Sequence, residues 1–133
     1  MELNYDCLRE TLIELENQLE ITNDLEIKPI GIHEITSNKN LFSKFQDKDI
    51  AYCVYMLADS GLIKTLSESD FIREISVETL TYKGHEFLKQ IENDTVWNKV
   101  KEVIKPIGAF TVGIISKVAE NVITGIITQG LIG

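Results

Sequence analysis

The sequence holds few of the residues that build common kinds of active site. Among 133 residues it has two histidines, two cysteines, two prolines and one tryptophan. The histidines, His33 and His85, lie far apart in the sequence. The chain has no HxxxH motif, paired-cysteine motif, P-loop or GxSxG motif. These absences argue against a metal centre, a phosphate-binding loop and a serine nucleophile. We therefore expect a protein that is not an enzyme and uses no cofactor.

The two cysteines, Cys7 and Cys53, form no CxxC word, and the N-terminus has neither a cationic start nor a long apolar run. We therefore expect no signal peptide, a cytoplasmic location and two free thiols that pack as small core residues. A Cys53–His85 dyad is conceivable if the fold brings the two side chains together, but nothing in the sequence selects it.

A surplus of basic residues is also missing, since thirteen Lys and Arg face twenty-one Asp and Glu and the net charge is −8. Eight acids and one base give −7 over residues 1–27, and twelve acids and eleven bases give −1 over residues 28–105. One acid and one base give a net charge of zero over residues 106–133. The net negative charge argues against a protein whose whole surface attracts phosphate. Residues 28–105 are nearly neutral, however, so net charge alone does not exclude nucleic acid as a partner.

The chain has the length of one domain, and its 44% hydrophobic residues are enough for a core. Apolar spacing and turn residues predict helices over residues 4–19, 48–60, 82–91 and 95–105, and strands over residues 62–66 and 75–81. A further β-like segment covers residues 25–32. Asp47 and Asp94 are the predicted N-caps of the second and fourth helices, and Gly61 is the predicted left-handed residue that ends the second.

This order of elements predicts a mainly α fold with a small β-hairpin: a winged helix-turn-helix plus C-terminal helices. In such a domain the helix over residues 48–60 is the one that enters the major groove of DNA. We expect a winged-helix domain over residues 1–93 and a C-terminal helical extension over residues 94–133, for oligomerisation or docking.

Three runs of sequence resemble a known family. They are IAYCVYMLADSGLI at residues 50–63, LTYKGHEFLKQI at residues 80–91 and DTVWNKVKEVIK at residues 94–105, and they resemble the domain of unknown function 2513 family. The resemblance covers most of residues 4–105. It implies the winged-helix fold and an origin in phages, prophages or bacterial genomes, but no settled activity. Cys53 stands where a histidine is common and Tyr55 where a lysine is common, so no role carries over to either.

The outer face of the predicted helix over residues 48–60 is a candidate partner-binding face. Its residues recur at i, i+4, i+7 and i+11, and they are Lys48, Tyr52, Tyr55 and Asp59. Two aromatic rings and a net charge of zero favour a protein contact over base readout, although packing of either tyrosine under a neighbouring element is an equal alternative. DNA binding is the alternative, because four lysines form a basic rim beside this helix. They are Lys39, Lys44, Lys48 and Lys64.

The last quarter of the chain is unusually apolar. Residues 107–133 carry only Lys117 and Glu120 as charges, and read as a helix they leave a narrow polar stripe and a wide apolar surface. We expect that surface to associate with further copies of the chain. The candidate oligomerisation residues are Phe110, Ile114, Val118, Val122 and Ile126. The alternatives are insertion of residues 107–133 into a membrane and an ordinary buried helix of the same core.

The sequence thus predicts a non-enzymatic module for protein–protein interaction and homo-oligomerisation. Two alternatives stay open, each with its own partner. One is a DNA-binding transcriptional regulator, and the other is a membrane-acting effector of a phage-conflict system that works through the apolar C-terminal helix.

Overall fold

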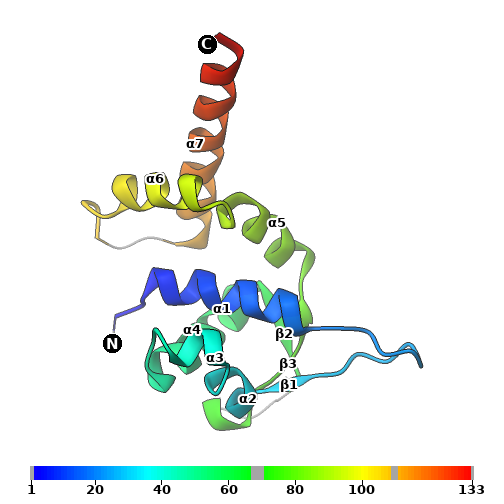
Figure 1. Cartoon of the computed structure of the whole chain (residues 1–133). Coiled ribbons are helices and arrows are strands. Elements are labelled where there is room, and N and C mark those ends of the chain that lie inside the picture. Colours follow the sequence, from blue (N-terminus) through cyan, green and yellow to red (C-terminus); the bar gives the residue numbers. More distant parts are fainter. Residues whose placement is uncertain (1, 67–70, 109–110, 133) are drawn as a thin grey trace. The chain divides into compact units, whose positions relative to one another are not determined.

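The structure is a computed structural model of the whole chain, and it describes residues 2–66, 71–108 and 111–132 (Figure 1). The fold is mainly helical with a small three-stranded antiparallel sheet, which confirms the predicted class. The chain forms two compact units, residues 1–85 and residues 86–133, and each is described by itself. This division falls inside α5 (Tyr82–Ile91), whereas the functional boundary expected after residue 93 stays a prediction.

The first unit begins with α1 (Tyr5–Gln18), a helix that buries one stripe of leucines. The stripe consists of Leu8, Leu12 and Leu15. Asn4 is the N-cap, and its Oδ1 accepts a hydrogen bond of 3.0 Å from the backbone N–H of Cys7. The cap satisfies one of the four amides that a helix N-terminus leaves without a partner inside the helix.

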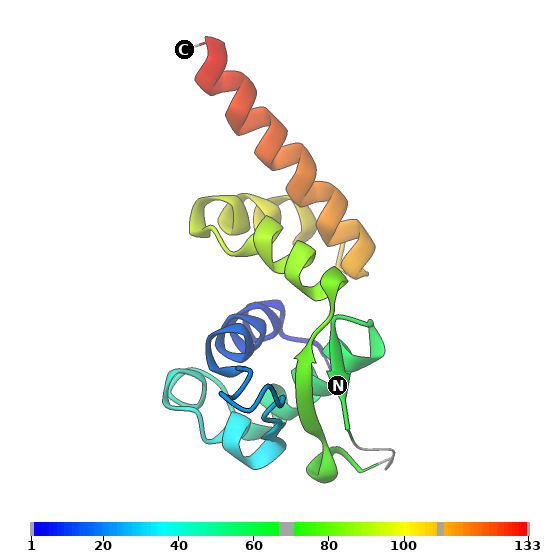
Figure 2. The same ribbon diagram turned by 90° about the vertical axis from the view of Figure 1, so that its right-hand side faces the viewer.

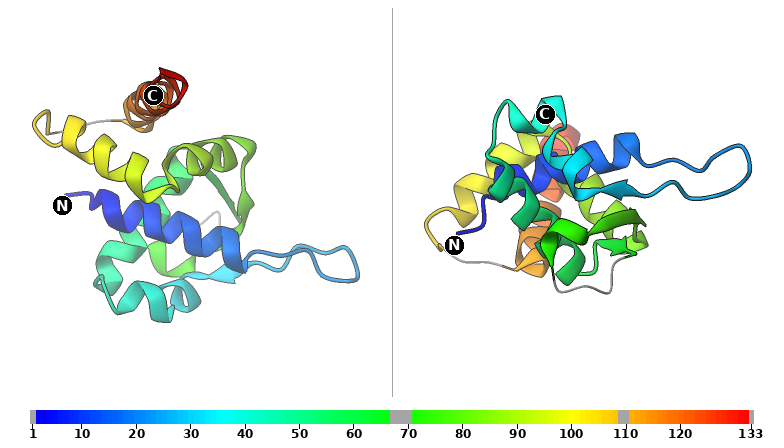
Figure 3. Two further views of the ribbon diagram at one scale, coloured as in Figure 1. Left: turned by 45° about the horizontal axis from the view of Figure 1, so that its top comes forward. Right: turned by 90° about the horizontal axis from the view of Figure 1, so that it is seen from below.

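After α1 the chain leaves the body of the first unit as an extended arm, residues 19–29 (Figure 3). The chain returns in β1 (Ile30–Gly31), which is shorter than the β-like segment that the sequence predicts. Ile32 was expected to continue that segment and instead begins α2 (Ile32–Thr36). Alternation of apolar residues cannot distinguish these outcomes over so few positions. Ile32 and Ile35 are both buried, and a spacing of three residues places them on one face of a helix.

A short helix, α3 (Lys39–Phe42), follows α2 and is capped by Asn38. The Oδ1 atom of Asn38 accepts hydrogen bonds from the backbone N–H groups of Asn40 and Leu41, at 2.9 and 3.2 Å. Leu41 is buried, so this turn closes one side of the core next to α1.

The next helix, α4 (Asp47–Asp59), lies in the centre of the first unit and contacts α1, α2 and α3. Its N-cap is Gln46, one residue before the predicted Asp47. Gly61 ends the helix as predicted, with a φ of 75°. The N–H of Leu62 bonds to the Leu57 carbonyl at 2.9 Å and that of Gly61 to the Ala58 carbonyl at 3.0 Å, which is the Schellman pattern.

The sheet consists of β1, β2 (Ile63–Thr65) and β3 (Ser76–Leu80) in the order β1-β3-β2, all antiparallel. The strands β2 and β3 form the predicted hairpin, with Ile63 opposite Leu80. A 3₁₀ turn, η1 (Ile72–Glu74), leads into β3, and the part of the connection at residues 67–70 lies outside the described residues.

Leu62, which follows the turn at the end of α4, contacts Thr81 and Gly84 where the hairpin passes into α5. The carbonyl of Leu62 accepts a 3.0 Å hydrogen bond from the N–H of Thr81, and the Thr81 hydroxyl accepts one from the N–H of Gly84, also at 3.0 Å. A Cβ at position 84 would lie 2.1 Å from the Leu62 carbonyl oxygen. Only glycine therefore fits there, and the close approach fixes the first turn of α5 against the start of β2.

The second unit holds the end of α5, α6 (Asp94–Ile104) and α7 (Val112–Ile132). The N-cap of α6 is Asn93, whose Oδ1 accepts a 3.1 Å hydrogen bond from the N–H of Val96, so the predicted cap Asp94 is again the first residue inside the helix. The helix α6 packs on α7, and within this unit α7 continues well past α6 (Figure 2).

Candidate functional site

The structure places the candidate partner face on the outside of α4. Lys48, Tyr55 and Asp59 are exposed and Tyr52 is half-buried, whereas the opposite side of the helix is fully buried. The rings of Tyr52 and Tyr55 stack, with centroids 6.5 Å apart and planes 12° from parallel. The two nearly parallel rings form an aromatic pair of the kind common in protein interfaces.

A small cleft lies beside this face, between α2, the start of α4 and η1. Its volume is about 200 Å³. The apolar part is formed by Ile32, Ala51 and Ile72. Lys48 and Arg73 line it as cations and Asp47 as an acid, which gives a formal charge of +1. Small-molecule sites usually measure roughly 300–1,000 Å³, so this cleft has room for a single side chain of a partner.

The arm, residues 19–29, is a structural feature that the sequence patterns did not reveal as a site. It is a hairpin closed by an antiparallel bridge between Ile21 and Ile27 and by a 2.8 Å bond from the N–H of Thr22 to the carbonyl of Glu26. The N–H of Leu25 bonds back to the Thr22 carbonyl at 2.9 Å. A type I turn followed by one left-handed residue has this pattern.

Leu25 occupies the left-handed position of that turn, with a φ of 63°. Glycine or asparagine is preferred there, because a Cβ in this conformation costs about 1–2 kcal/mol. The Leu25 side chain is also 86% exposed, so neither burial nor backbone preference explains a leucine at this place. An apolar residue held in a strained conformation at the end of a projecting hairpin is a candidate contact residue.

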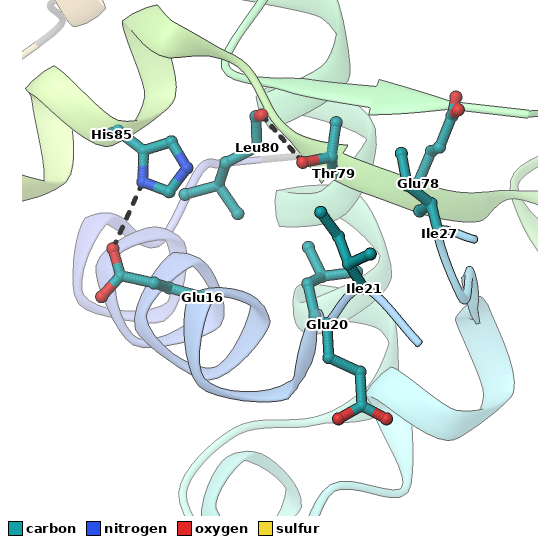
Figure 4. Close-up of a pocket in the computed structure, with 9 residues that line it drawn as sticks. Glu16, Glu20, Ile21, Ile27, Glu78, Thr79, Leu80 and His85 are labelled. Atoms are coloured by element: carbon teal, nitrogen blue, oxygen red, sulfur yellow. Dashed lines mark hydrogen bonds and ion pairs between the residues drawn. The ribbon is translucent and has the colours of Figure 1, made fainter. Parts of the chain in front are cut away.

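A second pocket, of about 180 Å³, lies where the arm meets α1, β3 and the first turn of α5 (Figure 4). Leu80 lines it from β3, and Ile21 and Ile27 line it from the arm. Nδ1 of His85 lies 3.5 Å from Oε2 of Glu16, both of which are solvent-exposed. This pair spans α1 and α5 and is open to water, so it acts as a surface contact inside the first unit.

The two cysteines face each other inside the core between α1 and α4, and both are buried free thiols. The Cys53 thiol donates to the backbone carbonyl of Asn4 at 3.7 Å, and Cys7 Sγ lies 3.9 Å from the Thr11 hydroxyl. The hydrogen-bonding interaction with the Cys7 thiol, together with burial, raises the pKa of Cys53 far above its ordinary range, and the same interaction lowers the pKa of Cys7. His85 has Glu16 as its partner instead, so the structure gives no support to a Cys53–His85 dyad.

In α7 the predicted oligomerisation residues lie along one flank of the helix. Ile114 is 45% exposed, whereas Val118, Val122 and Ile126 are half-buried. Phe110 lies outside the described residues. Among residues 112–129, whose burial the structure describes, Ile115 and Ala119 are fully buried, and neither is one of the predicted oligomerisation residues. They follow the same i, i+4 spacing, but the periodicity of a helix that is apolar around most of its circumference does not identify the side that packs.

Within residues 2–66, 71–108 and 111–132, no three His, Cys, Asp or Glu side chains gather in a way that could hold a metal ion. The helices over the same residues include none that is both long and apolar enough to span a membrane.

Comparison with known proteins places the chain in a family. The family model described as "Hypothetical protein (DUF2513)" matches residues 2–110. A Haemophilus influenzae protein (strain ATCC 51907 / DSM 11121 / KW20 / Rd), described as an uncharacterized protein, is 33% identical over 127 residues, which cover 93% of this chain and 97% of that protein. No solved structure matches the chain. The match over most of its length, together with the relative, shows that the chain belongs to the DUF2513 family.

Proposed function

We propose that this protein is a non-enzymatic module that associates with further copies of itself through α7. The observation that carries the proposal is the mismatch in length between α6 and α7. At a rise of about 1.5 Å per residue, the 11 residues of α6 span about 16 Å and the 21 residues of α7 about 32 Å. Because α6 is half as long, it covers only part of the apolar face of α7.

The burial of individual side chains follows this mismatch. Ile115 and Ala119, in the first half of α7, are fully buried. Val122 and Ile126 continue the same stripe and are only half-buried, and Ile127 is 57% exposed. A stripe that is covered at one end and open at the other is the surface that a symmetric partner helix would complete.

Charge favours association through this unit. Residues 86–133 carry five acids and five bases, so their formal charge is zero, whereas residues 1–85 carry sixteen acids and eight bases and hold the entire −8. Two copies of the second unit therefore approach without net repulsion, and the acidic first units resist aggregation. The proposal includes a phage or prophage origin, which the family resemblance implies, and a cytoplasmic location, which the resemblance does not bear on.

The test is Ile126→Asp in the full chain, with Thr128→Asp as the matched control on the polar stripe of the same helix. We expect sedimentation velocity to show an assembly for the unchanged protein and for Thr128→Asp, and a weaker assembly, by about tenfold or more in dissociation constant, for Ile126→Asp. A monomeric unchanged protein, or equal behaviour of the two variants, would refute the proposal.

The second candidate function is DNA binding by a winged helix-turn-helix. The order α1, β1, α2, α4, β2 and β3, with the sheet order β1-β3-β2, favours it. Against it, the exposed face of α4 has one lysine, Lys48, and one aspartate, Asp59, which is a poor set for base and phosphate contacts. A DNA mobility-shift assay at two salt concentrations tests this function. A shift that weakens steeply with salt supports DNA binding, and no shift at low salt refutes it.

A further inference from the structure

We infer that the arm of one copy docks in the cleft between α2, α4 and η1 of a second copy, with Leu25 as the inserted side chain. This contact is separate from the α7 association, because both of its surfaces belong to residues 1–85. The arm extends away from the body of its own unit (Figures 1 and 3). The cleft lies on that body, between residues of α2, α4 and η1. A second copy can therefore present its arm to the cleft.

Size supports the match. The cleft of about 200 Å³ fits one aliphatic side chain against Ile32, Ala51 and Ile72. Leu25 is the most exposed of the large apolar residues of the arm, at the end of a hairpin closed by the bridge between Ile21 and Ile27. Such a hairpin presents its end residue with little loss of conformational freedom on binding, which favours a single anchored contact.

Charge supports it as well. Residues 20–28 of the arm carry three acids and one base, for a formal charge of −2, and two of those acids, Asp24 and Glu26, flank Leu25 directly. The cleft carries Lys48 and Arg73 against Asp47, for a charge of +1. An apolar centre surrounded by opposite charges is the usual arrangement of an interface anchor and its rim.

The strained backbone at Leu25 gives a test that separates binding from folding. We compare Leu25→Asn and Leu25→Met in the full chain that also carries Ile126→Asp, so that α7 contributes less to the association. Asparagine tolerates the left-handed conformation, so the urea midpoint of Leu25→Asn should rise or stay unchanged, while its dissociation constant increases about tenfold or more. Leu25→Met keeps an apolar side chain and should associate within about threefold of its parent.

The location of the contact is tested by cross-linking under oxidised glutathione. A chain with Asp24→Cys is mixed with a chain with Thr36→Cys, in the cleft, or with Lys64→Cys, an exposed control on β2. We expect a mixed disulfide dimer with the first partner and not with the second. The native cysteines do not compete, because both are buried. Work at about 0.15 M salt screens the repulsion between acidic units over distances beyond roughly 8 Å.

The outcomes distinguish this inference from the α7 proposal. Equal cross-linking to both partners, or a Leu25→Asn variant that associates as tightly as Leu25→Met, would overturn the arm contact and leave α7 association standing. Loss of association in Leu25→Asn with no effect of Ile126→Asp would support the arm contact and overturn the α7 proposal.

Discussion

Replacing Gly84 by alanine tests the junction between the hairpin and α5. The added Cβ would lie 2.1 Å from the Leu62 carbonyl oxygen and 3.0 Å from the Leu62 carbonyl carbon. Both atoms are backbone, so no side-chain rotation relieves the clash. The first turn of α5 has to move away from β2 by about 1 Å, since nonbonded carbon and oxygen atoms do not approach much closer than their van der Waals separation.

The magnitude follows from what this movement disrupts. Two hydrogen bonds are strained, from Thr81 N–H to the Leu62 carbonyl and from Gly84 N–H to the Thr81 hydroxyl. Each contributes about 1 kcal/mol, and residual overpacking adds about 1–3 kcal/mol. The better helix propensity of alanine returns about 1 kcal/mol. We expect Gly84→Ala to lower the free energy of unfolding by about 3 kcal/mol in total.

The assay is urea unfolding followed by far-ultraviolet circular dichroism, with a thermal melt beside it. A loss of this size lowers the melting temperature by about 10 °C or more in a unit of this length. Gly31→Ala is the matched control in the same unit, because no atom beyond its two chain neighbours lies within 4 Å of its added Cβ and its φ of −74° and ψ of 156° suit any residue. It should be neutral or stabilise by up to about 1 kcal/mol. If Gly84→Ala unfolds within about 0.5 kcal/mol of the unchanged protein, the reasoning about this contact is wrong.

Two further predictions concern the N-terminal helix and the buried thiols. Asn4→Ala removes the cap of α1 and should destabilise the first unit by about 1 kcal/mol in the same urea assay. The control, Asn17→Ala on the exposed face of α1, should change stability by less than about 0.5 kcal/mol. Equal effects of the two substitutions would contradict the capping role of Asn4. The pKa of Cys53 is raised in the folded protein, so its thiol stays protonated while the unfolded chain ionises above about pH 8.5. Stability from this group is therefore complete below that pH and is lost as pH rises, by at most about 1.4 kcal/mol per pH unit. Because the pKa of Cys7 depends on its interaction with Cys53, both thiols are removed together. Urea titrations at pH 8 and pH 10 should show a smaller loss for the variant with Cys7→Ala and Cys53→Ala than for the unchanged protein, and an identical loss would refute the assignment.

Much of the local structure could be predicted from spacing alone. The span of α5 and the left-handed Gly61 both match expectation, because each depends on residues within one or two turns of one another. The helix starts at α4 and α6 were each displaced by one residue. In both places a polar residue precedes an aspartate, and backbone dihedral angles decide which of the two is the cap.

Part of the candidate site could likewise be predicted from local spacing, and part could not. The outer face of α4 follows from helical periodicity, so Lys48, Tyr55 and Asp59 were located correctly as a surface. The cleft beside it combines side chains from α2, α4 and η1, which are separated by many residues in the chain. The left-handed leucine of the arm was also missed, because leucine has no preference for that conformation and only the closed hairpin imposes it.

The sequence by itself determined the mainly helical class, the concentration of acid near the N-terminus and the apolar character of the last quarter of the chain, because composition and short-range periodicity are sufficient for these properties. The tertiary structure decided which residues far apart in the chain touch: Gly84 with Leu62, and α6 with only part of α7. Such contacts depend on the geometry of packing among all the elements, and a close approach of two backbones leaves no periodic signal in the residues that make it.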